Sequence, residues 1–296
     1  MRVPATRPSL DGEMPATRQP VRRPDLRADC AQCVGLCCVA LTLTASADFA
    51  IDKPAGEPCP NLKHDFRCGI HARLQDGGFP GCAVYDCFGA GQKVTQVTFG
   101  GRGDWRQAAD SGGLMFEVFS VMRLLHELLW YLTEALELAP PLRGELQRAL
   151  VDTERLTLAS PESLADLDAF AHRSRVNDLL LRTSELVRAG ASDTPRNGRG
   201  ADFRAAELRG HDFSGADLRG ADFRGADLRS AYLIAADLRH ADLTDADLIG
   251  ADLRDTDVRG ANLARSIFLT QMQLNATHGD AGTTLPPRLN RPSHWT

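Results

Sequence analysis

A five-residue repeat occupies the C-terminal part of this 296-residue chain and fixes its geometry. From Ala201 to Thr270 the sequence divides into fourteen units; eleven begin with Ala, and all have an apolar middle residue. The middle residues are Phe203, Leu208, Phe213, Leu218, Phe223, Leu228, Leu233, Leu238, Leu243, Leu248, Leu253, Val258, Leu263 and Phe268. A five-residue period would spread these residues around every face of an α-helix, so a helix is excluded. The pattern instead favours stacked repeats that share one core.

The pattern A-(D/N)-L-x-x over residues 201–270 resembles the pentapeptide-repeat family. The resemblance implies a right-handed quadrilateral β-helix with four units per coil, so fourteen units give about 3.5 coils. Residues twenty apart then stack, with Phe203 below Phe223. Three residues stand where the repeat has Ala: His211, Thr256 and Ser266. His211 is the largest, and we expect it to widen its coil or to mark the N-terminal end.

The residues beside each middle position are expected to face water. Ten of the preceding residues are Asp, and eight of the following ones are Arg. In the twenty-residue register, Arg219, Arg239 and Arg259 form one column. Residues 201–270 hold thirteen acids and nine Arg, which predicts a solvated, ion-paired and mildly negative surface.

Cysteine is the second signal, because all eight lie within one short segment. They are Cys30, Cys33, Cys37, Cys38, Cys59, Cys68, Cys82 and Cys87. Eight Cys would also permit 105 disulfide pairings. However, residues 1–29 have scattered Arg and Pro and no apolar core of a secretory signal, and no stretch is apolar enough to span a bilayer. We therefore expect a cytoplasmic location, where reduced thiols suit metal binding better than disulfides.

Residues 30–92 resemble the zinc- or iron-chelating domain family that opens with C-x2-C-x3-C-C. The resemblance implies that all eight cysteines contribute to metal binding. The residues leave open two zinc sites, a larger zinc-thiolate arrangement, or an Fe–S cluster with Cys left over. His64 and His71 could each replace a Cys ligand. The segment is poor in large apolar residues, so we expect it to need metal to fold.

Helical patterns separate these two segments. Apolar residues recur at three-four spacing from Leu114 to Leu136, with Pro140 ending that helix. A second helix is expected from Pro141 to about Thr157, and a third from Ser160 to about Ala189. His126, Trp130 and Tyr131 on the first helix are interpreted as core or docking residues.

The sequence thus predicts a multidomain chain of six segments. They are a disordered tail (1–29), a Cys-rich metal-binding module (30–104), a helical segment (105–190), a linker (191–200), the β-helix (201–270) and a C-terminal cap or tail (271–296). We expect the β-helix to fold independently of the Cys-rich module, because it buries its own ladder of apolar residues.

Three functions fit this organisation. The first is an intracellular metal-thiolate protein whose β-helix binds a protein or peptide. The second is a zinc-, iron- or Fe–S-dependent redox enzyme that acts on a peptide or thiol; the sequence identifies no catalytic residue for it. The third follows the quinolone-resistance members of the pentapeptide-repeat family, which resemble duplex DNA and bind topoisomerases. A basic stripe is missing from the sequence, which disfavours direct nucleic-acid binding.

Overall fold

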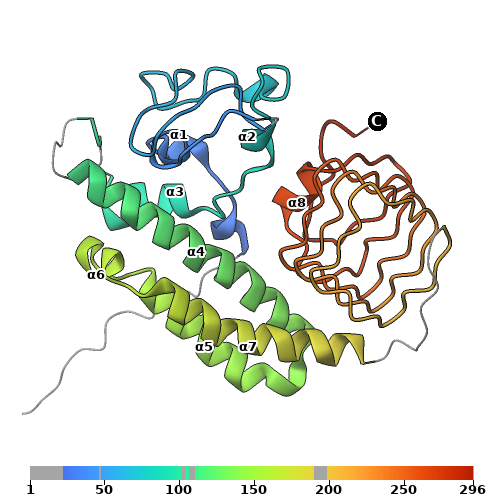
Figure 1. The fold of residues 1–296 in the computed structure, drawn as a ribbon. Helices are drawn as coiled ribbons and strands as arrows, with labels where there is room; N and C mark the ends of the chain where they lie inside the picture. The colour runs from blue at the N-terminus through green and yellow to red at the C-terminus, as the bar shows by residue number, and fades with distance from the viewer. Residues whose placement is uncertain (1–22, 47, 102–103, 107–110, 190–198, 296) are drawn as a thin grey trace, which may run out of the picture.

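The computed structural model describes residues 23–46, 48–101, 104–106, 111–189 and 199–295. Figure 1 shows three bodies: the Cys-rich module above one end of a long helix, a layer of helices, and a β-helix lying against their other end. The helices are η1 (Arg23–Leu26), η2 (Cys30–Gln32), α1 (Leu36–Ala40), η3 (His71–Arg73), α2 (Pro80–Val84), α3 (Ala90–Gln92), η4 (Lys93–Thr98), α4 (Ser111–Leu138), η5 (Pro140–Leu142), α5 (Arg143–Leu156), α6 (Pro161–Ala165), α7 (Ala169–Arg188) and α8 (Gln271–Asn275).

The N-terminal segment is ordered earlier than expected. Residues 1–22 of the expected tail lie outside the described residues, but η1 begins at Arg23. Leu26 is 1% exposed and belongs to the same apolar cluster as Phe88. Burial of one Leu stabilises by roughly 1.5–3 kcal/mol, which anchors this part of the chain to the body of the protein.

The helical segment is built on α4, whose apolar face is buried. Met122, Leu125, Leu129 and Leu132 are each 0% exposed, and α5, α6 and α7 pack on this helix. The prediction of a single helix from Ser160 to Ala189 is wrong, because the helix is interrupted between α6, which ends at Ala165, and α7, which begins at Ala169. At the break the Asp168 side chain accepts a hydrogen bond from the Ala171 N–H at 2.9 Å, which starts α7 as a new helix.

The repeat forms coils in the expected register. Parallel bridges join residues twenty apart, as in Asp202 to Asp222 and Asp222 to Asp242. The fifth residue of most units turns the corner in the left-handed region, with φ of 66° at Gly210 and 60° at His240. Glycine adopts that conformation without steric cost, which explains the frequent Gly at this position. The four sides are named here after their first bridged residues as the 202, 207, 212 and 217 faces.

Substitutions for Ala inside the coils are accommodated in different ways. Thr256 and Ser266 are 0% and 1% exposed, and their hydroxyls donate to the Leu233 and Leu243 carbonyls at 2.7 and 3.0 Å. His211 instead lies exposed in the first coil, with its ring 5.9 Å from that of Phe213. It therefore marks the N-terminal end of the stack rather than a widened interior coil.

The coils continue past residue 270, so the last part of the chain is more than a tail. Asp257 bridges to His278, and Asn262 bridges to Thr284. Helix α8 is inserted just before these bridges and starts with a capping box between Thr270 and Gln273. The Gln273 amide also donates to the Leu248 and Ala251 carbonyls at 2.7 and 2.9 Å, which ties α8 to the coil beneath it.

The helical segment and the β-helix share one apolar core. The cluster that contains Leu129 and Leu132 of α4 continues into the middle residues of the repeat. Tyr131 packs edge-on against Phe268, with ring centroids 5.8 Å apart. These two expected segments are therefore one structural unit, and the expected linker 191–200 lies outside the described residues except for its last two.

Phe268 departs from the repeat. The sequence predicts that Phe268 is the middle residue of the fourteenth unit and continues the coil. Its φ is instead 58°, and the chain leaves the coil at this residue. Its N–H donates to Glu134 Oε1 of α4 at 3.0 Å instead of to a further coil. Helix α4 thus satisfies a backbone donor that a free coil edge would leave unpaired.

Candidate metal centre

All eight cysteines line one cavity of about 190 Å³ in the Cys-rich module. The rest of its wall is mainly apolar and includes Leu43, Phe49 and Phe79. All eight are free thiols. Side chains that the sequence spreads over 58 positions, from Cys30 to Cys87, are therefore brought around a single hollow.

The first four cysteines are held by two short helices. Asp29 caps η2, accepting from the Ala31 N–H at 2.8 Å, and η2 begins at Cys30. Gly35 then turns the chain with a φ of 72°, and α1 presents Cys37 and Cys38. A side chain at Gly35 would be strained by this positive φ, and its Cβ would lie 2.8 Å from Leu62 Cδ1 and 3.3 Å from the Phe66 carbonyl oxygen.

The later cysteines come from loops and from α2. The Cys59 N–H donates to the Cys38 carbonyl at 2.9 Å, and Cys68 is bridged to Leu62 in a short antiparallel contact. Cys82 lies within α2. Cys87 precedes the turn that opens α3, where the Ala90 N–H donates to its carbonyl at 2.9 Å. Backbone hydrogen bonds thus fix several positions around the cavity.

The donor chemistry fits a thiophilic metal. The Cys37 and Cys38 sulfurs are 4.0 Å apart, close to the roughly 3.8 Å expected for two thiolates 2.3 Å from one tetrahedral zinc. A Cβ on Gly91 would lie 2.7 Å from Cys33 Sγ and 3.9 Å from Cys87 Sγ, so these two sulfurs share a space that only glycine leaves open. Within the described residues, however, no three His, Cys, Asp or Glu side chains already converge at metal-binding distance.

The protein surroundings keep several of these thiols protonated near neutral pH. Burial raises the pKa of Cys33 and Cys87 to about 11 and that of Cys82 to about 12. For Cys37, the hydrogen bond with Cys38 and then burial raise the pKa well above its usual value. Without a bound cation, these thiols are therefore weak nucleophiles.

The two candidate histidines differ in position. His71 is exposed and lies on the rim of the cavity. His64 is also exposed but is not part of the cavity wall, and its carbonyl accepts from Arg106 at 3.1 Å. Of the two, only His71 lies beside the thiols.

Two further residues of the module escaped the sequence reasoning. Lys53 is 3% exposed, and its ammonium donates to the Val39, Pro54 and Glu57 carbonyls at 3.2, 3.0 and 2.9 Å. Burial lowers the pKa of Lys53, which lies close enough to Cys59 and Cys38 to interact with their charge. Tyr85, which lies between Cys82 and Cys87 in the sequence, also lines the cavity. Tyr85 could have been identified from the sequence, because it lies between the candidate ligands Cys82 and Cys87. Nothing in the sequence pointed to Lys53.

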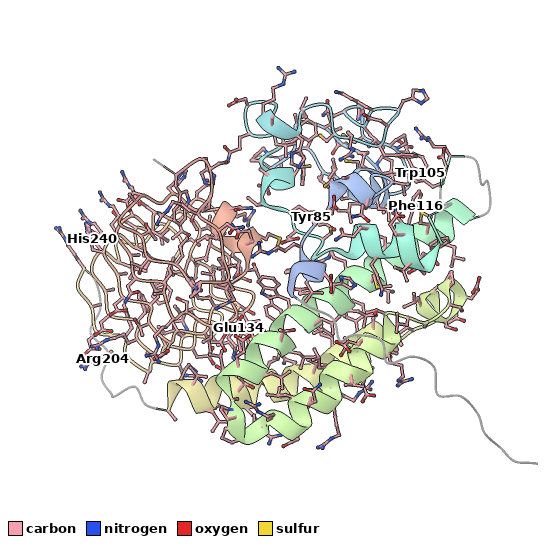
Figure 2. The ribbon with its side chains drawn as sticks, turned by 180° about the vertical axis from the view of Figure 1, so that it is seen from behind. Tyr85, Trp105, Phe116, Glu134, Arg204 and His240 are labelled. Atoms are coloured by element: carbon pink, nitrogen blue, oxygen red, sulfur yellow. The ribbon has the colours of Figure 1, made fainter. Side chains whose placement is uncertain are left out.

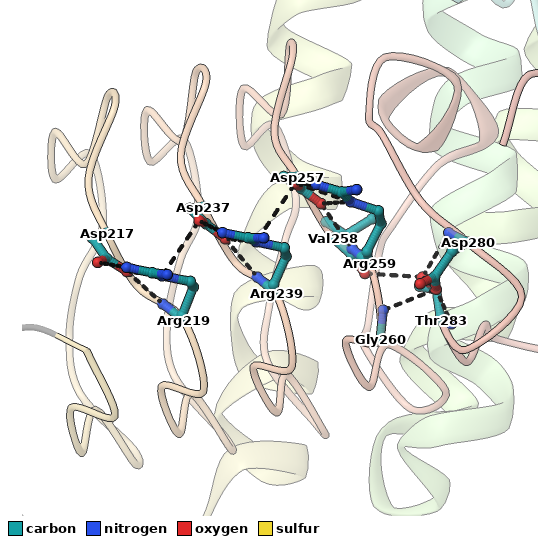
Figure 3. A network of polar contacts seen from close by, with 10 residues as sticks. All are labelled: Asp217, Arg219, Asp237, Arg239, Asp257, Val258, Arg259, Gly260, Asp280 and Thr283. Carbon is teal, nitrogen blue, oxygen red and sulfur yellow. Dashed lines mark hydrogen bonds and ion pairs between the residues drawn. The ribbon is translucent and has the colours of Figure 1, made fainter. Parts of the chain in front are cut away.

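The 217 face of the β-helix carries the expected ladder of ion pairs. Arg219 pairs with Asp217 of its own coil and lies 3.5 Å from Asp237 of the next. Arg239 repeats this arrangement, 2.6 Å from Asp237 and 3.7 Å from Asp257 (Figure 3). Hydrogen bonding from Arg219 lowers the pKa of Asp217 to about 2. The acids of this face are thus neutralised by neighbouring guanidinium groups.

Most of the 207 face is buried rather than solvated, contrary to expectation, because α7 covers it beyond Glu207, which stays 71% exposed. Asp227 and Asp247 are both 0% exposed, and Arg229 lies 3.2 Å from the first and 3.6 Å from the second. Arg188 of α7 reaches Glu207 at 3.0 Å and Asp227 at 3.8 Å. Asp227, Asp247 and Arg229, which would otherwise face water, therefore form an enclosed polar contact between the β-helix and the helical segment.

Across the described residues, none of the helices is both long and apolar enough to cross a bilayer.

The sequence model of the family "Pentapeptide repeats" matches residues 199–233 and 226–265, in eight copies. Among solved structures, a pentapeptide repeat protein of the Arabidopsis thaliana thylakoid lumen is 29% identical, with 31% of this chain and 59% of that chain covered and a TM-score of 0.17. HetL of Nostoc sp. strain PCC 7120, a pentapeptide repeat protein involved in heterocyst differentiation regulation, is 25% identical, with 30% and 46% covered and a TM-score of 0.20.

The similarity to a second bacterial protein extends over nearly the whole chain. The "Uncharacterized protein YybG" of Bacillus subtilis (strain 168) is 57% identical over 276 residues. The match covers 92% of this chain and 95% of YybG, so it includes the Cys-rich module and the helices as well as the repeats. The chain therefore belongs to the same family as YybG and carries pentapeptide repeats in its C-terminal part.

Proposed function

We propose that this protein is a metal-thiolate protein whose β-helix serves as a surface for binding another protein or a peptide. The observation that supports the metal site is the gathering of all eight cysteines around one cavity. The metal is zinc or iron, including an Fe–S cluster, held by Cys30, Cys33, Cys37, Cys38, Cys59, Cys68, Cys82 and Cys87, with His71 as a further candidate on the rim. When bound, it would replace the thiol protons and hold together a module with little apolar core of its own.

The proposal includes a cytoplasmic location. Eight free thiols in one cavity suit a reducing compartment, because in an oxidising one they would be open to disulfide formation.

The proposed interaction surface consists of the 202 and 217 faces. Helix α7 covers the 207 face, and part of the 212 face contacts the Cys-rich module through Arg254 and Asp48, 3.2 Å apart. Ion pairs such as Arg204–Asp202 and Arg239–Asp237, each at 2.6 Å, line the two remaining faces. A partner would therefore meet a polar, internally paired surface on which hydrogen bonding and shape decide the fit.

Elemental analysis of the full-length protein, purified anaerobically with a thiol reductant, tests the metal site. We expect bound zinc or iron in the wild type and its loss in the double variant Cys37→Ser/Cys38→Ser. His64→Ala is the matched control, since this exposed residue of the same module is not part of the cavity wall. Equal metal content in the wild type and the double variant would refute the assignment. Visible absorption separates iron from colourless zinc.

A redox enzyme is the second candidate function. It is favoured by one observation: Cys82 and Tyr85 line both the thiol cavity and an adjoining cleft of about 500 Å³. A ligand in that cleft would lie beside the metal ligands. Catalytic turnover needs an open coordination position, whereas a purely structural zinc site is closed by four protein ligands.

A further inference from the structure

The cysteines pack against two different parts of the protein, although they share one cavity. The apolar cluster in which the module meets α4 is contacted by Cys33, Cys37 and Cys87. The small apolar cluster around Leu43 and Phe79 contains or contacts Cys38, Cys59 and Cys82. The first three thiols are called proximal here and the other three distal, according to their position relative to α4.

The proximal thiols lie at the junction between the module and α4. Tyr85, Trp105 and Phe116 pack against the same apolar cluster, and in Figure 2 they lie where the module meets this helix. Trp105 packs edge-on against Phe116 of α4, with ring centroids 5.9 Å apart. Its indole N–H donates to the Val34 carbonyl at 2.9 Å, next to Cys33 in the chain. The backbone that carries the proximal thiols is therefore held by the helical segment.

Cys30 joins the proximal thiols. It begins η2 and lies close enough to Cys33 and Cys37 for their charges to interact. The Cys33 and Cys87 sulfurs share the space beside Gly91, where an added Cβ would lie 2.7 and 3.9 Å from them. The proximal set thus has the four thiols of Cys30, Cys33, Cys37 and Cys87.

Cys68 joins the distal thiols. The Leu62 N–H donates to the Cys59 carbonyl at 2.9 Å, and Leu62 is bridged to Cys68. The thiol charges that act on Cys82 are those of Cys37, Cys59 and Cys68. The distal set thus has the four thiols of Cys38, Cys59, Cys68 and Cys82.

A buried cation lies beside the distal set. The three N–H bonds of the Lys53 ammonium all go to neutral carbonyl oxygens. A buried charge needs an opposite charge nearby, and the charges that act on Lys53 are, largest first, those of Cys59, Cys38 and Glu57. Four thiolates around one divalent metal carry a net negative charge that Lys53 can offset.

Cys37 and Cys38 lie at the boundary between the two sets. Consecutive residues of a helix point about 100° apart, so α1 can direct its two thiols to different neighbours. Cys37 packs against the cluster at α4 and Cys38 against the cluster around Leu43. Their sulfurs are 4.0 Å apart, so the two sets lie side by side.

We infer that the cavity binds two metal ions, one at the proximal and one at the distal set of four thiols, rather than a single cluster shared by all eight. The inference rests on the proposed metal-thiolate function and deepens it by assigning each ligand to a site. Four protein ligands close a tetrahedral zinc site. Two closed sites favour the non-enzymatic function over the redox enzyme.

Pairs of serine substitutions test this division, because each pair removes the same number of thiols. The full-length protein is loaded with Zn²⁺ under a thiol reductant and then exposed to a chelator that leaves the wild type loaded. The wild type should hold about two zinc ions per chain, and Cys30→Ser/Cys33→Ser and Cys68→Ser/Cys82→Ser about one each. Cys30→Ser/Cys68→Ser takes one ligand from each site and should hold none.

Hydrogen exchange shows which site each variant keeps. Cys68→Ser/Cys82→Ser should lose protection in residues 48–79 and keep it in residues 90–98, next to α4. Cys30→Ser/Cys33→Ser should do the reverse. Because the two variants perturb different parts of the module, misfolding of one leaves the other as a test.

The possible results separate this inference from the proposed function. Equal zinc content in the three double variants would overturn the division and assign all eight thiols to one cluster. A wild type that takes up no zinc and contains no iron after anaerobic purification would refute the metal-thiolate function itself.

Lys53→Met tests the distal site without removing a thiol. It should lower the zinc affinity of that site by about tenfold or more, because the thiolates lose a neighbouring cation. Competition with a chromogenic chelator measures the change, and the proximal zinc of the same molecule is the internal control. Equal weakening of both zinc ions, or of neither, would contradict the assignment of Lys53 to the distal site.

Discussion

Glu134 of α4 and Arg288 near the end of the chain form an ion pair of 2.6 Å, with side-chain exposures of only 2% and 15%. The same Glu134 oxygen accepts the Phe268 N–H at 3.0 Å, and Arg288 also donates to the Ser266 carbonyl at 3.1 Å. One carboxylate thus joins the helical segment to both the last coil and the C-terminal segment.

Removing the Glu134 charge should be strongly destabilising. In Glu134→Gln the Arg288 guanidinium stays largely enclosed without its counter-ion, which costs about 3 kcal/mol of the free energy of unfolding. Urea denaturation measures the loss. The exposed Glu117→Gln on the same helix should change stability by less than about 0.5 kcal/mol. Equal stability of the two variants would show that the pair contributes nothing.

Asp247 predicts an unusual dependence of stability on pH. Burial raises its pKa to about 7, offset only in part by the Ser184 side chain, the Ile249 N–H and Arg188, while Asp227 raises it further. In the unfolded chain the carboxyl returns to a pKa near 3.9. Between these values the folded state binds the additional proton. The Asp247 contribution to stability is therefore fully present below about pH 4 and is lost as the pH rises to about 7.

Asp247→Asn should remove this component, making the protein more stable at pH 8 and less dependent on pH between 4 and 7. Thermal denaturation at a series of pH values measures both effects. Asp212→Asn is the control, because hydrogen bonds from the Ser214 side chain and backbone lower the pKa of Asp212. A wild-type pH profile that Asp247→Asn leaves unchanged would contradict the assignment.

Metal removal should loosen one part of the chain only. The distal half of the Cys-rich module buries a small apolar cluster of Leu43, Cys59 and Phe79, whereas α4 and the repeats share a large one. Chelation under reducing conditions should therefore speed hydrogen exchange within residues 30–101. Residues 128–138 and 221–263 should stay protected together, because the core that they share contains no cysteine. Met115 to Leu125 of α4 pack instead against Leu36 and Val94 of the module. Mass spectrometry of exchanged peptides resolves these regions; simultaneous loss of protection throughout would contradict this expectation.

The protein should not inhibit DNA gyrase supercoiling at micromolar concentration. Along the 202 face, Asp202 and Thr284 are separated by four bridged steps. At about 4.8 Å per step they span about 19 Å, little more than half of one duplex turn of about 34 Å. Duplex DNA also carries one unpaired negative charge per 1.7 Å, whereas the aspartates of the 217 face are bound by Arg219, Arg239 and Arg259. The supercoiling assay should use the full chain, because α4 contributes to the core of the repeats. Potent inhibition would restore the DNA-mimic function.

Periodic residues were the most predictable part of this protein. A fixed spacing specifies which side chain stacks on which, so the Arg219, Arg239 and Arg259 column followed directly from the sequence. The gathering of the cysteines remained a hypothesis, because their order in the chain gives no distances between sulfurs. Burial of Asp227 and Asp247 was not foreseeable, since their units look like those of the solvated faces. The docking of α7 is what distinguishes the 207 face from the solvated faces of the β-helix, and this contact with a distant segment leaves no mark in the five-residue pattern.

The contacts of Arg188 and Glu134 with different coils also limit how this β-helix can evolve. A free-standing repeat can gain or lose a coil by duplication or deletion of twenty residues, because each coil contacts only its neighbours. Here Arg188 contacts the second coil at Asp227, and Glu134 contacts the fourth coil at Phe268. An added coil between them would shift one contact by about 4.8 Å relative to the other. The distance between Arg188 of α7 and Glu134 of α4 thus fixes how many coils can lie between Asp227 and Phe268.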